Sequence, residues 1–165
     1  MIEIKESDFK SIEIASLKKE VREYYRKHLQ GSTVYNLDAL LGINLTRKGI
    51  EHVCFSGEQS AIKLALVQRL DQVLVTAKRT GWGDKKFKDT DGVVGYVKFS
   101  AMVKVFGRVM KVLIVTRCVG KGRNNLDGLS IQYYHHSYDP KENPRNFLNE
   151  KGTDARGSRK IASRL

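Results

Sequence analysis

The sequence is poor in the residues that build disulfide frameworks and metal clusters. It holds two cysteines and four histidines among 165 residues. Cys54 and Cys118 stand apart, with no CxxC spacing, so two buried thiols in a reducing compartment are expected rather than a disulfide. No apolar run is long enough for a membrane-spanning helix, and the opening MIEIKESDFKSIEI lacks the apolar segment of a secretory signal. We therefore expect a cytoplasmic protein with no membrane partner.

Acidic residues are scarce in the second half of the chain. Residues 1–91 hold 16 Lys and Arg against 13 Asp and Glu, a net charge of +3, whereas residues 92–165 hold 14 against 5, a net charge of +9. From Lys98 to Arg123 there are seven basic residues and no acidic one. A field of one sign favours a polyanion, most simply nucleic acid. The alternative is a basic surface that has no specific partner.

Two segments show the three- and four-residue apolar spacing of helices. The first is residues 7–30, with Ser7 as a plausible N-cap and Gly31 as a stop. The second runs from residue 58 to about 79, with Ser56 as its cap. Between them, glycines divide the chain into short strands or turns, and the glycines and charges of TGWGDKKFKDTDG predict a loop over 80–92.

Two long strands, 93–105 and 108–119, are predicted to form a hairpin with a two-residue turn at Phe106-Gly107. If Val105 pairs with Arg108, nearly all the residues that meet on one face are apolar, which supports this register. The other face is then basic and partly aromatic, and it holds Tyr96, Lys98, Lys104, Lys111 and Arg117.

A third strand starts at Leu129 and ends in the sequence YYHHSYD. Strict alternation puts Tyr134 and His136 on its polar face and His135 on its apolar side. Adjacent histidines that point apart cannot readily bind one ion, and the sequence has neither HExxH nor a Cys/His cluster. We therefore expect no metal and no cofactor.

Cleavage of RNA needs only a base for the 2′-hydroxyl proton, an acid for the 5′-oxygen and cations for the phosphorane. Histidine suits both proton steps because its pKa lies near neutrality. We take His52 and His136 as candidates for the proton-transfer pair, Lys98 and Arg117 as the phosphate clamp, and Tyr134 as an orienting group. Candidates for further contacts with nucleic acid are Lys104, Lys111, Tyr96, Ser56, Lys121 and Arg123.

Several of these residues, and two others, His135 and Trp82, have a structural alternative. His52 lies among apolar residues and is about as well explained as a hydrogen-bonded core histidine, whereas His135 is better explained by structure than by function. Tyr96 opposite Arg117 is also consistent with a cation–π pair across the strands. Ser56 is better explained as a helix cap, and Trp82 as an anchor of the fold.

The order of these pieces resembles a known domain type over residues 33–139. The resemblance rests on Gly-Ile-x-His at 49–52, on the hairpin turn at Val105–Arg108 and on Tyr-x-His at 134–136. It is to nuclease domains of the barnase–EndoU–colicin–RelE (BECR) group, in the versions found in large polyvalent proteins of phages and prophages. The resemblance implies a metal-independent RNase toxin acting in the bacterial host cell, and catalytic groups at His52 and His136. Glu51 departs from the basic residue expected beside His52.

The sequence thus predicts an α+β fold, BECR-like, with N-terminal helices packed on a three- to four-stranded antiparallel sheet. It divides into an N-terminal helix (1–32), a nuclease-type domain (33–139) and a basic, flexible tail (140–165). The expected partners are RNA, with transfer RNA as one candidate, and an acidic immunity protein. Two alternatives remain open, a non-catalytic nucleic-acid-binding module and a phage accessory protein that binds a host protein.

Overall fold

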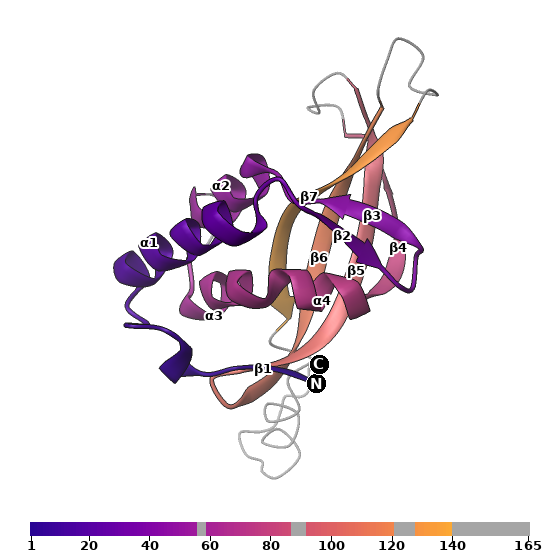
Figure 1. The fold of residues 1–165 in the computed structure, drawn as a ribbon. Helices are drawn as coiled ribbons and strands as arrows, with labels where there is room; N and C mark the ends of the chain where they lie inside the picture. Colours follow the sequence, from indigo (N-terminus) through magenta and orange to yellow (C-terminus); the bar gives the residue numbers. More distant parts are fainter. Residues whose placement is uncertain (56–58, 87–91, 121–127, 140–165) are drawn as a thin grey trace.

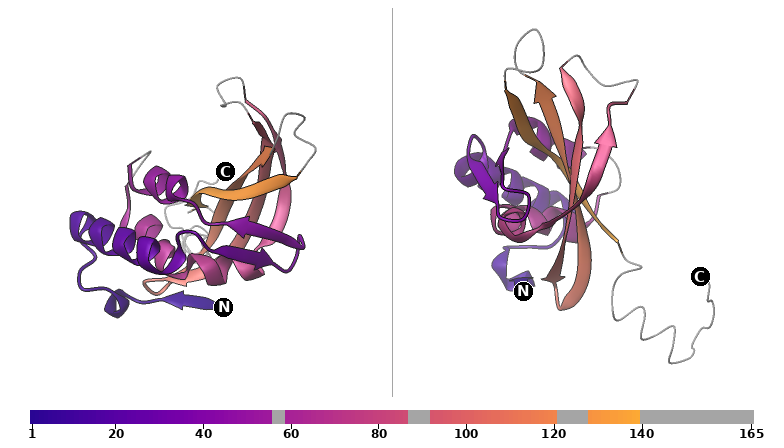
Figure 2. Two further views of the ribbon diagram at one scale, coloured as in Figure 1. Left: turned by 45° about the horizontal axis from the view of Figure 1, so that its top comes forward. Right: turned by 90° about the vertical axis from the view of Figure 1, so that its right-hand side faces the viewer.

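The computed structural model describes residues 1–55, 59–86, 92–120 and 128–139. Its strands form one mixed, seven-stranded sheet: β1 (Ile2–Ile4), β2 (Thr33–Asn36), β3 (Leu41–Asn44), β4 (Lys78–Asp84), β5 (Val93–Val105), β6 (Arg108–Gly120) and β7 (Leu129–Asp139). The order is β1-β5-β6-β7-β3-β2, and β4 also pairs with β5. The sheet is curled, as Figure 2 shows.

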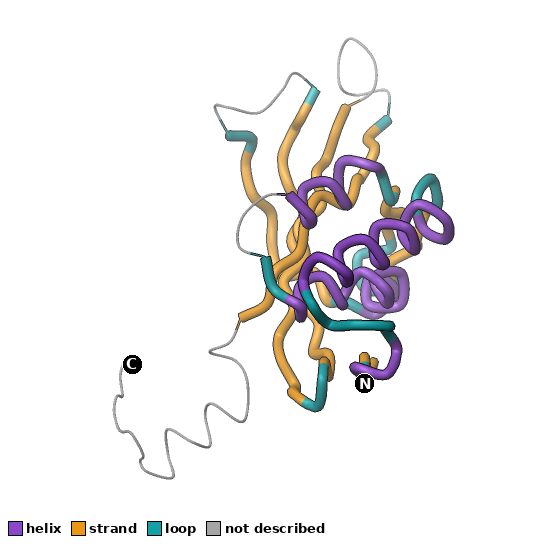
Figure 3. Tube along the Cα trace, turned by 90° about the vertical axis from the view of Figure 1, so that its left-hand side faces the viewer, coloured by secondary structure: helices purple, strands orange, loops and turns teal. Residues whose placement is uncertain are grey.

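The helices lie on one face of this sheet (Figures 1 and 3). They are α1 (Ile14–Tyr24), continued by the π-helical turn η2 (Tyr25–Leu29), then α2 (Arg47–Phe55), α3 (Ala61–Ala65), the 3-10 turn η3 (Leu66–Arg69) and α4 (Leu70–Thr76). A short 3-10 turn, η1 (Glu6–Asp8), precedes them. The hydrophobic core fills the space between the helices and the sheet.

The predicted hairpin of β5 and β6 is confirmed in register. Val105 pairs with Arg108 and Tyr96 with Arg117. Phe106 and Gly107 both have positive φ, 52° and 77°, which is the geometry of the two-residue turns that match strand twist. The alternating apolar residues of both strands face the core as expected. Those buried there include Val97, Phe99, Val103, Met110, Val112 and Ile114.

The predicted antiparallel sheet of three to four strands is wrong. The sheet has seven strands, and two of its pairings are parallel, β1 with β5 and β3 with β7. The strand β4 lies partly in the segment 80–92, which was predicted to be a loop. Gly81 and Gly83 suggested a loop there, although this segment pairs with β5. Parallel partners distant in the chain leave no local signal.

The two predicted helices are present but interrupted. The first begins after Glu13 instead of Ser7 and ends at Leu29, two residues before Gly31, whose φ of 87° agrees with the predicted stop. The second begins after Ser60, whose hydroxyl accepts a hydrogen bond from the Lys63 amide at 3.0 Å. The predicted cap, Ser56, lies outside the described residues.

The segment after β3 is a helix, not the short strands or turns expected from its glycines. Gly49 lies within α2 and is buried against β7. A Cβ at this position would lie 2.9 Å from the backbone oxygen of Tyr133 and closer still to the ring. The missing side chain lets α2 approach β7 closely, and it places His52, one turn further on, beside the same strand.

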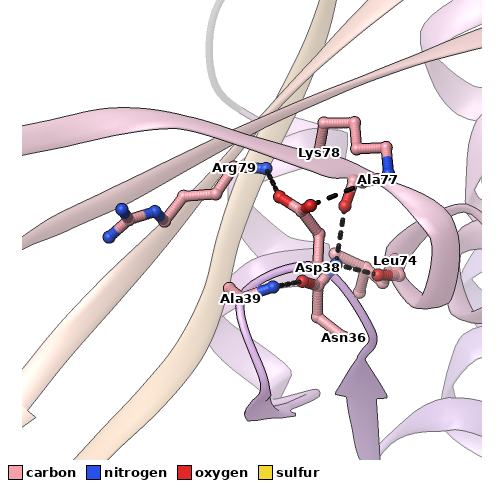
Figure 4. Close-up of polar contacts among 7 residues, drawn as sticks. All are labelled: Asn36, Asp38, Ala39, Leu74, Ala77, Lys78 and Arg79. Atoms are coloured by element: carbon pink, nitrogen blue, oxygen red, sulfur yellow. Dashed lines mark hydrogen bonds and ion pairs between the residues drawn. The ribbon is translucent and has the colours of Figure 1, made fainter.

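The buried amide of Asn36 ties the end of β2 to the end of α4 (Figure 4). Its Nδ2 donates to the carbonyl oxygens of Leu74 at 2.7 Å and Ala77 at 2.8 Å, and its Oδ1 accepts from the Ala39 amide at 2.7 Å. These carbonyls lie at the helix end, where intrahelical donors are lacking. One side chain thus satisfies a helix end and a tight turn together.

We expect Asn36→Ala to lower the free energy of unfolding by about 2–4 kcal/mol, because it leaves buried carbonyl oxygens without a donor. Asp38→Ala is the matched control from the same turn. Asp38 accepts from the Arg79 amide and pairs with Lys78 at 3.7 Å, both at exposed positions, so its loss should cost about 1 kcal/mol or less. Urea unfolding followed by circular dichroism measures both, and equal losses would refute the assignment.

Candidate functional site

Strand β7 carries one more residue than β6 at the centre of their pairing. Val115 pairs with His135 and Thr116 with Tyr133, so Tyr134 is the extra residue of a β-bulge. A bulge shifts the alternation of side chains along its strand. Tyr133 and His136 consequently both face the core, 1% and 0% exposed, and Tyr134 and His135 stay partly exposed.

The predicted position of His136 on the open face with Lys98 and Arg117 is therefore wrong, and so is that of His135 on the core side. His136 is enclosed and both of its ring nitrogens are bonded. Nε2 donates to the Lys63 carbonyl oxygen at 2.6 Å, and Nδ1 accepts from the Tyr133 hydroxyl at 2.6 Å. Burial lowers the pKa of His136 to about 4. His136 is a neutral structural residue that joins β7 to α3.

His52 instead meets His135 and Tyr134, the two residues that the bulge turns outward. Its ring is stacked on His135, with 4.8 Å between centroids and 23° between planes, and lies 4.7 Å from the Tyr134 ring. Tyr96 continues the series, 6.1 Å from Tyr134. A row of four aromatic rings thus runs from α2 across β7 to β5.

Two cations lie over this row. The guanidinium of Arg117 is 5.0 Å from the centre of the Tyr134 ring, and the ammonium of Lys86 is 5.6 Å from that of Tyr96. Such distances allow a cation–π attraction. Tyr96 and Arg117 are cross-strand partners, as predicted, but the arginine is stacked on Tyr134.

These residues open into a groove of about 420 Å³, here called the α2–β7 groove. It is lined by Lys48, Glu51, His52, Phe55, Arg117 and Tyr134. A second hollow of about 450 Å³ adjoins it at the start of α2 and shares Lys48 and Arg117. The groove therefore joins an aromatic wall to cations from both α2 and β6.

The electrostatics of the groove keep its histidines neutral. Burial is the main cause that lowers the pKa of His52, and the charges of Lys63 and Arg117 add to it. The pKa of His135 falls to about 4, through burial and then through His52, His136, Lys63 and Lys86. Within the described residues, His52 Nδ1 and Arg117 Nε are buried without a hydrogen-bond partner. The site is thus cationic through Arg117 and the lysines, not through the imidazoles.

The remaining predicted residues lie elsewhere or outside the described residues. Lys98 is exposed on the open face beside Gly83. Lys104 pairs with Glu3 at 3.8 Å, and Lys111 lies six residues before Arg117 on β6, roughly 20 Å away at the rise of a strand. Neither lysine belongs to the groove. Ser56, Lys121, Arg123 and the predicted tail 140–165 fall outside the described residues.

Lys48, Phe55 and Lys63 were not among the predicted site residues, and His135 was expected to be structural. The spacing of Lys48, His52 and Phe55 at i, i+4 and i+7 would have placed them on one helical face, had residues 47–55 been recognised as a helix. The bulge that exposes His135 has no comparable signal. The four residues 133–136 are all polar or aromatic, so their pattern does not show where the alternation shifts. Groups of three or more metal-ligating side chains are absent from the described part of the chain.

The domain is a mixed sheet with helices on one face, and a cationic, aromatic groove lies between α2 and the strands β6 and β7. A comparison with protein families shows to which family the chain belongs. Residues 12–134 match the family called large polyvalent protein-associated domain 3, and the chain belongs to that family. It is thus a domain of the kind associated with polyvalent proteins of phages.

Comparisons with curated proteins and with solved structures returned no match. In the described residues, no helix combines the length and the apolar character needed to cross a membrane.

The lowered pKa values of His135, which is partly exposed, and His136, which is buried, predict a pH dependence of stability. A pKa of about 4 in the folded protein, against about 6.5 in the unfolded chain, means that the unfolded state binds more protons between these values. Stability is therefore full above about pH 6.5 and falls as the pH drops towards 4, by about 3 kcal/mol for His136 alone.

Urea unfolding at a series of pH values measures this slope. His135→Gln should reduce the slope of stability against pH between pH 6.5 and 4 by up to the value for one proton. NMR should show His136 as the neutral Nε2–H form at pH 5.5. A His136 resonance that titrates near pH 6.5 would contradict the buried position.

The close approach of α2 to β7 can be tested separately. Gly49→Ala places a methyl group against Tyr133, so α2 must shift, at a cost of about 1–3 kcal/mol. The shift should also weaken the ring-current effects of His52 on the His135 protons, measured by NMR. Gly81→Ala is the control, since no atom lies within 4 Å of its added Cβ. Unchanged chemical shifts of the His135 protons in Gly49→Ala would show that the contact of Gly49 with Tyr133 does not determine the position of His52 in the groove.

Proposed function

We propose that this domain binds single-stranded RNA in the α2–β7 groove. The observation that carries the proposal is the Arg117 guanidinium over the Tyr134 ring, in a groove that Lys48 and His52 also line. Proteins that bind single strands combine cations for the backbone with aromatic faces for the bases. Arg117 and Lys48 would take the phosphate, and Tyr134 would offer its ring to a base.

The charge of the chain supports the same ligand. The net charge of +12 attracts a polyanion at long range, and the groove supplies local contacts. Glu51, the acidic residue of the groove lining, pairs with Arg47 at 3.1 Å. Its charge is thus partly offset and does not set the sign of the groove.

A second candidate, cleavage of the bound RNA, is favoured by the stacked pair of His52 and His135. The His52 ring helps to lower the pKa of His135, after burial, and the two rings stack at 4.8 Å. A bound phosphate would raise the pKa of the adjacent imidazole, and one ring could then be protonated beside a neutral one.

Such a pair has the two states that transesterification needs. The neutral imidazole of His52 would accept the proton of the 2′-hydroxyl as its oxygen bonds to phosphorus. Protonated His135 would give its proton to the departing 5′-oxygen, which leaves a 2′,3′-cyclic phosphate. This assignment replaces His136, whose ring nitrogens are both engaged in the core.

Binding is tested with a labelled oligouridine of about 12 nucleotides. We expect Arg117→Gln to weaken binding about tenfold and to reduce the slope of log affinity against log salt by about 0.7, the value for one phosphate of a single strand. Lys104→Gln removes the same charge outside the groove and should bind within about twofold of the wild type. Equal effects of the two variants would reject the groove as the binding site.

The same oligonucleotide in EDTA tests cleavage. Fragments ending in 2′,3′-cyclic phosphate, lost in His52→Gln and in His135→Gln, would support the paired mechanism. Binding without fragments would reject cleavage and leave a binding module. No binding at low salt, together with capture of an acidic protein, would reject RNA as the ligand.

A further inference from the structure

A second basic groove lies on the other side of α2, between α1 and α2. It has a volume of about 510 Å³ and is here called the α1–α2 groove. Neither the family nor the proposed RNA site accounts for it. Its lining holds five cations and two carboxylates: Lys18, Lys19, Arg22, Arg26, Arg47, Glu23 and Glu51.

The charges of this groove are not balanced within it. Glu51 is already paired with Arg47, so Glu23 is the remaining carboxylate of the lining beside the four cations of α1 and η2. Lys18, Arg22 and Arg26 follow one another at i, i+4 and i+8 along α1 and η2. Like charges at this spacing destabilise a helix. A bound anion would relieve the repulsion, so the arrangement favours a ligand with several negative charges.

Phe55 connects the two grooves. It lines the α2–β7 groove, and cations that line the α1–α2 groove lie over its ring, Lys18 Nζ at 5.5 Å and Arg22 Cζ at 4.7 Å from the centroid. A large apolar side chain that is 60% exposed at the junction of two cationic grooves is suited to stack on a base. Glu51 and Arg47 border both sides of α2 as well.

We propose that the strand bound in the α2–β7 groove continues across the end of α2 into the α1–α2 groove. Arg22, Arg26 and Lys19 form a second phosphate subsite there, and Phe55 stacks on a base between the two subsites. The ligand is therefore a single strand long enough to span both sides of α2. This inference rests on the RNA binding proposed above and adds the path of the strand and its minimum length.

The test compares two oligouridines of about 4 and about 12 nucleotides, the short one able to fill a single groove. The double variant Arg22→Gln/Arg26→Gln should weaken binding of the long strand about tenfold or more and lower its salt slope by about 1.4, the value for two phosphates. Binding of the short strand should stay within about twofold. Phe55→Leu should weaken the long strand without changing its salt slope.

Two controls accompany the double variant. Lys10→Gln/Arg79→Gln removes the same charge from exposed positions outside both grooves and should bind like the wild type. Arg22→Lys/Arg26→Lys keeps the charge and should retain the salt slope of the wild type. Arg22 and Arg26 are exposed, so thermal unfolding should show all these variants folded.

The outcomes separate the two proposals. If Arg117→Gln weakens binding but Arg22→Gln/Arg26→Gln matches its charge control on the long strand, the second subsite is rejected and the first groove stands. If Arg22→Gln/Arg26→Gln lowers the affinity for the short and the long strand equally, the proposed path of the long strand into the α1–α2 groove is rejected. If the wild type binds neither oligonucleotide at low salt, both proposals fail.

Discussion

The close contact between α2 and β7 sets the position of the α2–β7 groove. Gly49 has no side chain to hold the helix away from the Tyr133 ring, so the two elements meet at backbone distance. That contact brings His52 over the bulged residues of β7 and leaves Phe55 at the exposed end of the helix. The two grooves lie on either side of this one helix.

Because of the bulge at Tyr134, the adjacent residues His135 and His136 have different environments. On a regular strand, His135 and His136 would face opposite sides, with Tyr134 beside His136. The extra residue reverses the assignment, so that His136 satisfies the Lys63 carbonyl oxygen inside the core and His135 meets His52 outside it. A single irregularity in strand pairing thus changes which imidazole is accessible to a ligand, with no change in sequence order.

The sequence predicts the parts of the fold in which neighbouring residues set the geometry. Alternation across Phe106-Gly107 gave the register of β5 and β6, and Gly31 marked the end of the first helix. It does not predict β1, nor the parallel pairing of β3 with β7, because these partners lie far apart along the chain. The groove was predicted in part, because His52, Tyr134 and Arg117 do lie together. Gly49 suggested a turn at a position where a helix packs. The bulge that places His135 in the position expected for His136 has no signal in the neighbouring residues.

The pairing of β1 has a consequence for how the chain folds. Ile2–Ile4 lies in parallel with Val103–Val105, so the first strand finds its partner only after roughly a hundred residues of chain have been placed. The entropy of closing so long a loop is lost before the strand gains its hydrogen bonds. During synthesis, the first residues must therefore wait until β5 has left the ribosome. The parallel pairing of β3 with β7 comes later still, because β7 is the last strand in the sequence. The domain is therefore expected to fold slowly and as one unit.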